Sequence, residues 1–223
     1  MKCRFIGLLK LTLIAFAANS TVSLARQLDV VVFDNSGAPL AEAIVSIPIL
    51  ANEPTQPSTA IVDQVDKMFV PFVLPVRPGV TINFPNSDNI RHQVYSFSEA
   101  KPFELPLYSN QEAPAITFDK PGLVVLGCNI HDGMRAYVLV SPYIESVVTD
   151  ADGVATLSSE MDFNEVSVWY PGVSDDIREQ VKVVVDAGQE RIEVHLDVAK
   201  DQQERTELSP LQQRFNRRAR TDG

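Results

Sequence analysis

Short apolar runs that alternate with polar residues recur along most of the chain, and this pattern predicts β-strands. The runs are rich in Val, Ile and aromatic residues, and no segment carries a convincing helical period. We predict strands at residues 27–33, 41–50, 80–84, 93–97, 123–126, 135–140, 166–169, 180–185 and 191–198.

The segments between these runs carry turn residues. Asp, Asn, Gly and Pro gather at 34–37, 119–122, 150–153 and 186–189, where they favour tight turns. The chain has 15 Pro, and several lie beside predicted strands, which suits sheet edges and loops better than helices. The pattern therefore predicts an all-β protein built as a β-sandwich.

The first 25 residues have the pattern of a signal peptide. Lys2 and Arg4 precede an apolar stretch at 5–18, and a small-residue end at 23–25 predicts cleavage before Arg26. The stretch is shorter than the roughly 20 residues of a membrane span, so we expect a periplasmic protein without membrane insertion after cleavage. Cys3 leaves with the leader, and Cys128 is then unpaired in an oxidising compartment, where a bound metal would protect it.

The chain is acidic, with a formal net charge of −10. Lys2, Arg4 and Lys10 leave with a leader that holds no acidic residue, so the mature chain carries −13. Such a surface argues against nucleic acid or anionic lipid as partners. It suits a basic redox partner, although solubility alone would also explain the charge.

Four soft or borderline metal donors lie in two short segments. Cys128, His131 and Met134 follow one another at spacings of three, and His92 lies upstream. A thiolate and two imidazoles in a plane, with a weak axial thioether, form the donor set of a blue-copper electron-transfer site. Two other interpretations remain open, a buried structural thiol and a Cys–His nucleophile pair, although no third group is evidently placed to orient that pair.

At these residues the chain resembles a cupredoxin, from about residue 61 to 142. The runs at 69–71, 76–86 and 128–131 follow the plastocyanin-like pattern in order, and the Cys-x2-His-x2-Met spacing is the short loop of amicyanins. The fuller string is similar to periplasmic cupredoxin-like proteins labelled methylamine utilization proteins. The resemblance implies a cupredoxin Greek-key sandwich and one copper ion at His92, Cys128, His131 and Met134. Gly127 departs from the pattern, since plastocyanins have an aromatic residue before the Cys.

The flanking segments resemble a different domain. Residues 28–47 look like the first hairpin of a carboxypeptidase regulatory-like or transthyretin-like sandwich, and 148–157 resemble the hairpin that normally follows it. We therefore expect the cupredoxin domain, 61–142, to be inserted into a discontinuous sandwich made of 27–58 and 143–199. The alternative is two consecutive domains. The polar tail, 200–223, is expected to be disordered.

The expected function is to carry single electrons between redox proteins, such as a c-type cytochrome or a periplasmic dehydrogenase. Copper delivery, storage or sensing is the alternative. We do not expect an enzyme, because copper oxidases and reductases need further His ligands and only His195 remains. The resemblance implies that the ring edge of His131 reaches the surface amid an apolar patch, for which Pro71, Phe72 and the region of Gly133 are the candidates.

Overall fold

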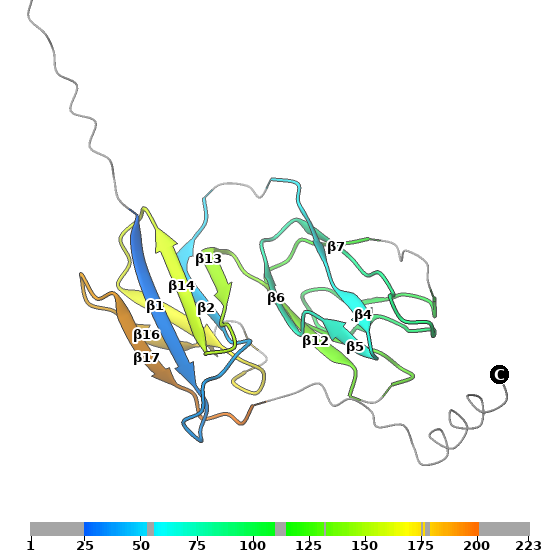
Figure 1. The fold of residues 1–223 in the computed structure, drawn as a ribbon. Coiled ribbons are helices and arrows are strands. Elements are labelled where there is room, and N and C mark those ends of the chain that lie inside the picture. The colour runs from blue at the N-terminus through cyan, green and yellow to red at the C-terminus, as the bar shows by residue number, and fades with distance from the viewer. Residues whose placement is uncertain are drawn as a thin grey trace, which may run out of the picture.

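The computed structural model describes residues 25–52, 56–109, 115–131, 133–174, 176 and 179–200. Over these residues the protein is all-β, with no α-helix, which confirms the predicted fold class. None of the described segments forms a helix long and apolar enough to span a bilayer. The strands fall into two groups that lie side by side (Figure 1).

The first group combines strands from the two ends of the chain. One sheet has the order β14-β1-β17 and the other the order β13-β2-β15-β16. Their bounds are β1 Arg26–Phe33, β2 Ile44–Leu50, β13 Tyr143–Val148, β14 Val154–Ser159, β15 Glu165–Trp169, β16 Val181–Val184 and β17 Arg191–His195. Leu28, Val30 and Val32 lie on one face of β1, where they are fully buried and pack in a core with residues of both sheets.

The second group is formed by the middle of the chain. A five-stranded sheet of order β6-β12-β11-β8-β9 faces a sheet of order β10-β7-β3, beside the hairpin β4-β5. The bounds are β3 Thr59–Ile61, β4 Asp63–Val65, β5 Met68–Val70, β6 Val73–Val76, β7 Val80–Asn83, β8 Tyr95–Ser96, β9 Phe103–Glu104, β10 Ile116–Phe118, β11 Gly122–Gly127 and β12 Arg135–Val140. A second apolar core, which includes Phe69, Phe84 and Phe118, fills this group.

The chain leaves the first group and returns to it at adjacent points. Leu50 at the end of β2 is paired with Tyr143 at the start of β13, and the Ala51 N–H donates a hydrogen bond to the Pro142 carbonyl at 3.0 Å. The first group of strands thus comes from the predicted flanking parts, 27–58 and 143–199, and the second group comes from the predicted inserted part, 61–142, and the residues just before it. That each part is a separate domain stays a prediction.

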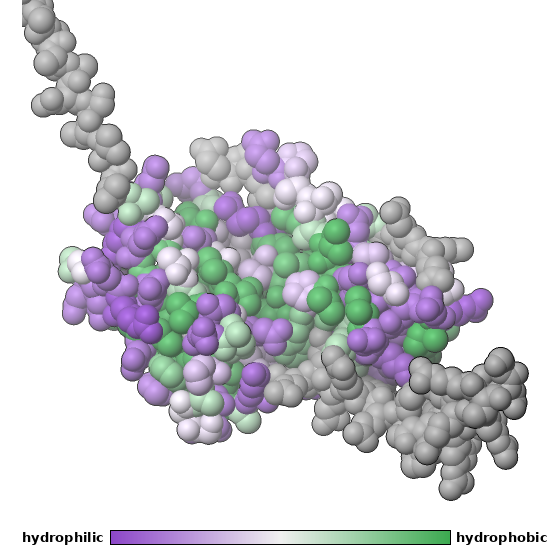
Figure 2. Space-filling view, viewed as in Figure 1, coloured by the Kyte–Doolittle hydropathy of each residue, from purple (hydrophilic) through white to green (hydrophobic). Residues whose placement is uncertain are grey.

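A third apolar cluster lies between the two groups, and we call it the seam. It contains Ile44 and Trp169 from the first group and Phe72, Val73, Leu123 and Leu139 from the second. Tyr137 joins the two sides, because its ring lies 5.6 Å from that of Trp169 and 5.4 Å from that of Phe72, both in edge-on geometry. Figure 2 shows apolar residues gathered in the middle of the molecule, between two more polar ends.

The seam corrects one expectation. Phe72 is only 5% exposed, so the prediction that it lies on an open apolar patch is wrong. The part of the outer face of the five-stranded sheet next to Phe72, formed by Val73, Leu123 and Leu139, is covered by the first group of strands.

Candidate metal centre

One loop, between strands β11 and β12, carries three of the four predicted donor residues. Cys128 directly follows β11, and His131 and Met134 precede β12, so the loop 128–134 begins and ends on one hairpin whose last pair is Gly127 with Arg135. Within the loop, the Cys128 N–H donates to the Met134 carbonyl at 3.2 Å, and the Met134 N–H donates to the His131 carbonyl at 3.3 Å. A short loop bonded to itself leaves its side chains few alternative positions.

His92 reaches the same point from a different segment. It is fully buried and pairs through its backbone with Tyr108, since each residue donates its N–H to the other's carbonyl at 2.9–3.0 Å. Asn86 adds an Nδ2–H bond to the Tyr108 carbonyl at 2.9 Å. The backbone on both sides of His92 is therefore fixed before any ligand binds.

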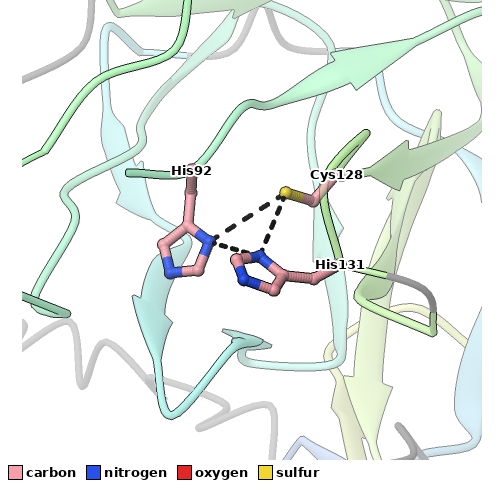
Figure 3. Close-up of side chains that lie close together, drawn as sticks. All are labelled: His92, Cys128 and His131. Atoms are coloured by element: carbon pink, nitrogen blue, oxygen red, sulfur yellow. Dashed lines mark hydrogen bonds between the residues drawn. The ribbon is translucent and has the colours of Figure 1, made fainter. Parts of the chain in front are cut away.

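The Sγ of Cys128 and the Nδ1 atoms of the two histidines form a compact triangle (Figure 3). The two Nδ1 atoms are 3.1 Å apart, and Sγ lies 4.0 Å from that of His92 and 3.8 Å from that of His131. A point equally far from all three atoms lies about 2.1 Å from each, close to the usual lengths of about 2.0–2.1 Å for metal–imidazole and about 2.3 Å for metal–thiolate bonds. The triangle thus fits a single transition-metal ion without rearrangement.

Asp88 orients His92 from the side away from the triangle. Its Oδ2 accepts a hydrogen bond from the Nε2 of His92 at 2.7 Å. If Nε2 carries the proton, Nδ1 turns a lone pair toward Cys128 and His131, as a metal-ligating imidazole requires. Asp88 is itself held by the backbone N–H groups of Asp66 at 2.8 Å and Lys67 at 2.9 Å, both of which have positive φ in the β4–β5 turn.

Sequence reasoning did not identify Asp88 as part of the site. The available signal was a carboxylate four residues before His92. Its contacts with the turn at 66–67 depend on long-range packing, which the spacing does not show.

The surroundings of Cys128 favour its thiolate. Burial opposes ionisation, but bonding to His92 and the backbone N–H groups of Gln93 and Ile130, together with the charge on His92, lowers the pKa of the Cys128 thiol. Burial likewise opposes the charged form of His92, but its bonds to Cys128 and Asp88 outweigh burial and raise its pKa. Burial and the nearby charge of His92 lower the pKa of His131. The surroundings thus favour the Cys128 thiolate and the neutral His131 imidazole, which are the forms that bind a metal, whereas His92 must give up a proton when a metal binds.

The four donors predicted from the sequence are placed as follows. The structure brings His92, Cys128 and His131 together, with donor atoms within 4.8 Å of one another. Met134 is 3% exposed and packs in the core of the same group of strands, next to the triangle along the chain. That these four residues are copper ligands, with Met134 axial, stays a prediction.

Among the described residues, no other group of three or more His, Cys, Asp or Glu side chains could hold a metal ion. His195, the remaining histidine, lies on β17 in the first group of strands, where it is exposed and its ring stacks on Phe33 at 4.9 Å. A groove of about 1150 Å³ opens beside the candidate site, and Cys128, His131 and Met134 contribute to its lining.

No protein-family model and no curated protein matches the chain. Among solved structures, it is similar to the Cu-containing nitrite reductase from Thermus scotoductus SA-01, at 30% identity and a TM-score of 0.35 over 42% of this chain and 25% of that one. A mutant of amicyanin in the reduced form matches at 23% identity and a TM-score of 0.35, over 44% of this chain and 98% of that one. A purple cupredoxin from Nitrosopumilus maritimus matches at 20% identity and a TM-score of 0.33, over 38% of this chain and 99% of that one. The matched part thus spans a quarter of the nitrite reductase chain.

Proposed function

We propose that this protein binds one copper ion through His92, Cys128 and His131, with Met134 as a weak axial ligand, and carries single electrons. The observation that supports the proposal most directly is the triangle of two Nδ1 atoms and one Sγ, with sides of 3.1, 3.8 and 4.0 Å. A His₂Cys plane with an axial Met is the arrangement of blue-copper electron-transfer sites. When bound, copper supplies a one-electron couple.

The protein's own part is to keep the donors still while the charge on the metal changes. Asp88 fixes the ring of His92, and backbone hydrogen bonds within the loop 128–134 fix the segment that carries Cys128 and His131. Held in this way, the donors rearrange little between the two oxidation states, which favours fast electron exchange. Copper delivery would instead call for ligands that move apart easily, so this rigidity supports the carrier over the delivery protein.

The histidine content supports a carrier over an enzyme. The chain has 3 His, two of which lie in the triangle. The third, His195, belongs to the other group of strands. A second copper centre of the kind that copper oxidases and reductases use would have no His ligands left.

The setting that we propose follows from the leader and the charge. Residues 1–24 lie outside the described part of the chain, and their sequence favours export to the periplasm. A buried free thiol at Cys128 persists in that compartment when a metal holds it. A c-type cytochrome or a periplasmic dehydrogenase is the proposed partner, and methylamine metabolism is one pathway in which such a carrier would serve.

Copper titration of the mature protein tests the proposal. We expect one equivalent to bind and to produce an intense visible thiolate-to-copper charge-transfer band, because Cys128 lies within the triangle. Cys128→Ser should abolish the band, while His195→Gln, the matched control for general histidine binding, should leave it unchanged. Copper binding without that band, or binding of zinc alone, would refute the electron-carrier function.

A further inference from the structure

Tyr95 lies directly against the backbone next to Cys128. A Cβ atom built on Gly127 would come within 2.7 Å of Cζ and Oη of the Tyr95 ring and 3.1 Å of its Cε1. Separations below about 3 Å do not occur between non-bonded carbon atoms, so the ring occupies the space that any side chain at 127 would fill. The bare glycine backbone is what lets the ring approach.

The pairing of the strands explains this contact. Gly127 of β11 and Tyr95 of β8 are direct partners across the antiparallel ladder, and such partners face the same side of a sheet. Val124, Leu126 and Cys128 point into the core of their own group of strands, whereas Leu123 packs in the seam. By this alternation Gly127 and Tyr95 lie on the outer face, on the opposite side of the sheet from the Cys128 side chain.

A short connection therefore links the sulfur of Cys128 to the Tyr95 ring. It runs along the backbone from Cys128 to Gly127 and across the ring contact. Electronic coupling falls steeply with distance, and bonded atoms, hydrogen bonds and ring contacts carry it better than open space.

On its other side the Tyr95 ring reaches the groove. Both Tyr95 and Phe97 contribute to the groove lining, and their ring centroids are 5.1 Å apart. Phe97 is 80% exposed, although large apolar side chains are usually covered. The two rings thus form a continuous aromatic connection from the backbone beside Cys128 to solvent.

We propose that electrons pass through the Tyr95 ring between the metal held by Cys128 and a protein docked over the groove. The inference rests on the proposed function and adds a route to it. When the acceptor is the ferric haem of a c-type cytochrome, copper(I) becomes copper(II) and the haem iron becomes ferrous. One electron moves, no bond forms or breaks, and the Tyr95 phenol keeps its proton because the ring conducts without being oxidised.

The test measures the limiting rate at which the reduced, copper-loaded protein reduces a ferric c-type cytochrome at saturating cytochrome concentration. Tyr95→Phe keeps the ring and should stay within about twofold of wild type. Tyr95→Leu removes the ring and should slow the limiting rate about tenfold or more, which corresponds to about 1.4 kcal/mol in activation free energy. The absorption band and the reduction potential should not change in either variant, because neither substitution touches a ligand.

Two further variants separate conduction from other effects. Gly127→Ala retains Tyr95 but pushes its ring away from the backbone, so it should also slow the reaction. Tyr143→Leu makes the matched change at another aromatic residue of the groove lining and should leave the limiting rate unchanged. A double-mutant cycle on the unfolding of the metal-free protein gives a readout that does not involve electron exchange: Gly127→Ala should cost less stability in the Tyr95→Leu background than in wild type.

Tyr95 would be excluded as the route if Tyr95→Leu exchanged electrons as fast as wild type with an unchanged spectrum. The same conclusion would follow if Tyr143→Leu slowed the reaction as much, because the groove would then act only in docking. Both outcomes differ from failure of the proposed function, in which the wild-type protein itself would show no charge-transfer band or no electron exchange.

Discussion

Replacing Asp88 by Asn tests how far this carboxylate contributes to the candidate metal centre. Its two oxygens accept three N–H groups, from Asp66, Lys67 and the ring of His92, at 2.7–2.9 Å. An Asn side chain has one carbonyl oxygen and one NH₂ group in the same place. At least one of the three N–H groups would therefore face another donor, and the negative charge would be lost.

The expected loss follows from these contacts. Removing the outer partner of a metal-ligating His usually costs about 10- to 100-fold in metal affinity, which is about 1.4–2.7 kcal/mol. A buried N–H left without an acceptor costs about 1–3 kcal/mol in stability. We expect Asp88→Asn to raise the copper(I) dissociation constant about 10- to 100-fold and to lower the free energy of unfolding of the metal-free protein as well.

Copper(I) affinity is measured by competition with a chelator of known affinity, and stability by urea unfolding of the metal-free protein. Asp63→Asn is the matched control, because Asp63 accepts hydrogen bonds from Ser87 and from the backbone N–H of Gln64 in the same region and has no contact with His92 among those described. This control should lose stability and keep its copper affinity. Equal copper affinities in Asp88→Asn and wild type would refute the argument that Asp88 orients His92.

Three other changes test separate parts of the structure. Met134→Leu should raise the reduction potential while the visible band survives, since copper(II) loses more than copper(I) when a weak donor is removed; voltammetry that shows an unchanged potential would exclude Met134 as a ligand. Phe72→Ala should destabilise the protein by about 3–5 kcal/mol in urea unfolding, because this ring fills the seam, and a loss below about 1 kcal/mol would contradict the observed packing. Burial raises the pKa of Tyr108 to about 12 from 10.0, so the free energy of unfolding should fall as pH rises from 10 to about 12. Tyr108→Phe should flatten that fall, and an identical pH profile in this variant would show that another group titrates.

Most of the long strands could be predicted from the sequence because their apolar residues alternate with polar ones or form an unbroken run. Sequence reasoning missed β4 and β5, which have three residues each and are joined by Asp66 and Lys67 at positive φ, with no Gly or Asn to indicate a turn. It also missed β3, β6, β9, β10 and β13, and it indicated β14 only through the resemblance of 148–157 to a hairpin. Every residue of β13 is half-buried, so no alternation is visible there.

The candidate site was predictable to different degrees. Cys128 and His131 lie in one loop, so their spacing alone indicated a shared site, and the structure brings His92 to them. The position of Phe72 was misjudged because the surface that covers it comes from residues such as Ile44 and Trp169, far away in the sequence. One feature of the sequence could have indicated that this face of the sheet is covered: the unbroken apolar run at 123–126 is typical of a strand buried on both faces.

The adjacent positions of Leu50 and Tyr143 have a consequence for the order in which the chain folds. Their pairing encloses about 90 residues, and closing a flexible loop of that length costs about 4 kcal/mol in chain entropy. If the middle segment folds first, strands β3 to β12, within residues 59–140, are already ordered by their own contacts, and a much shorter flexible connection remains between β2 and β13. The strands β2 and β13 would therefore pair fastest after the middle segment has folded. A metal ion that speeds folding of the middle segment would also speed this pairing, although it does not contact β2 or β13.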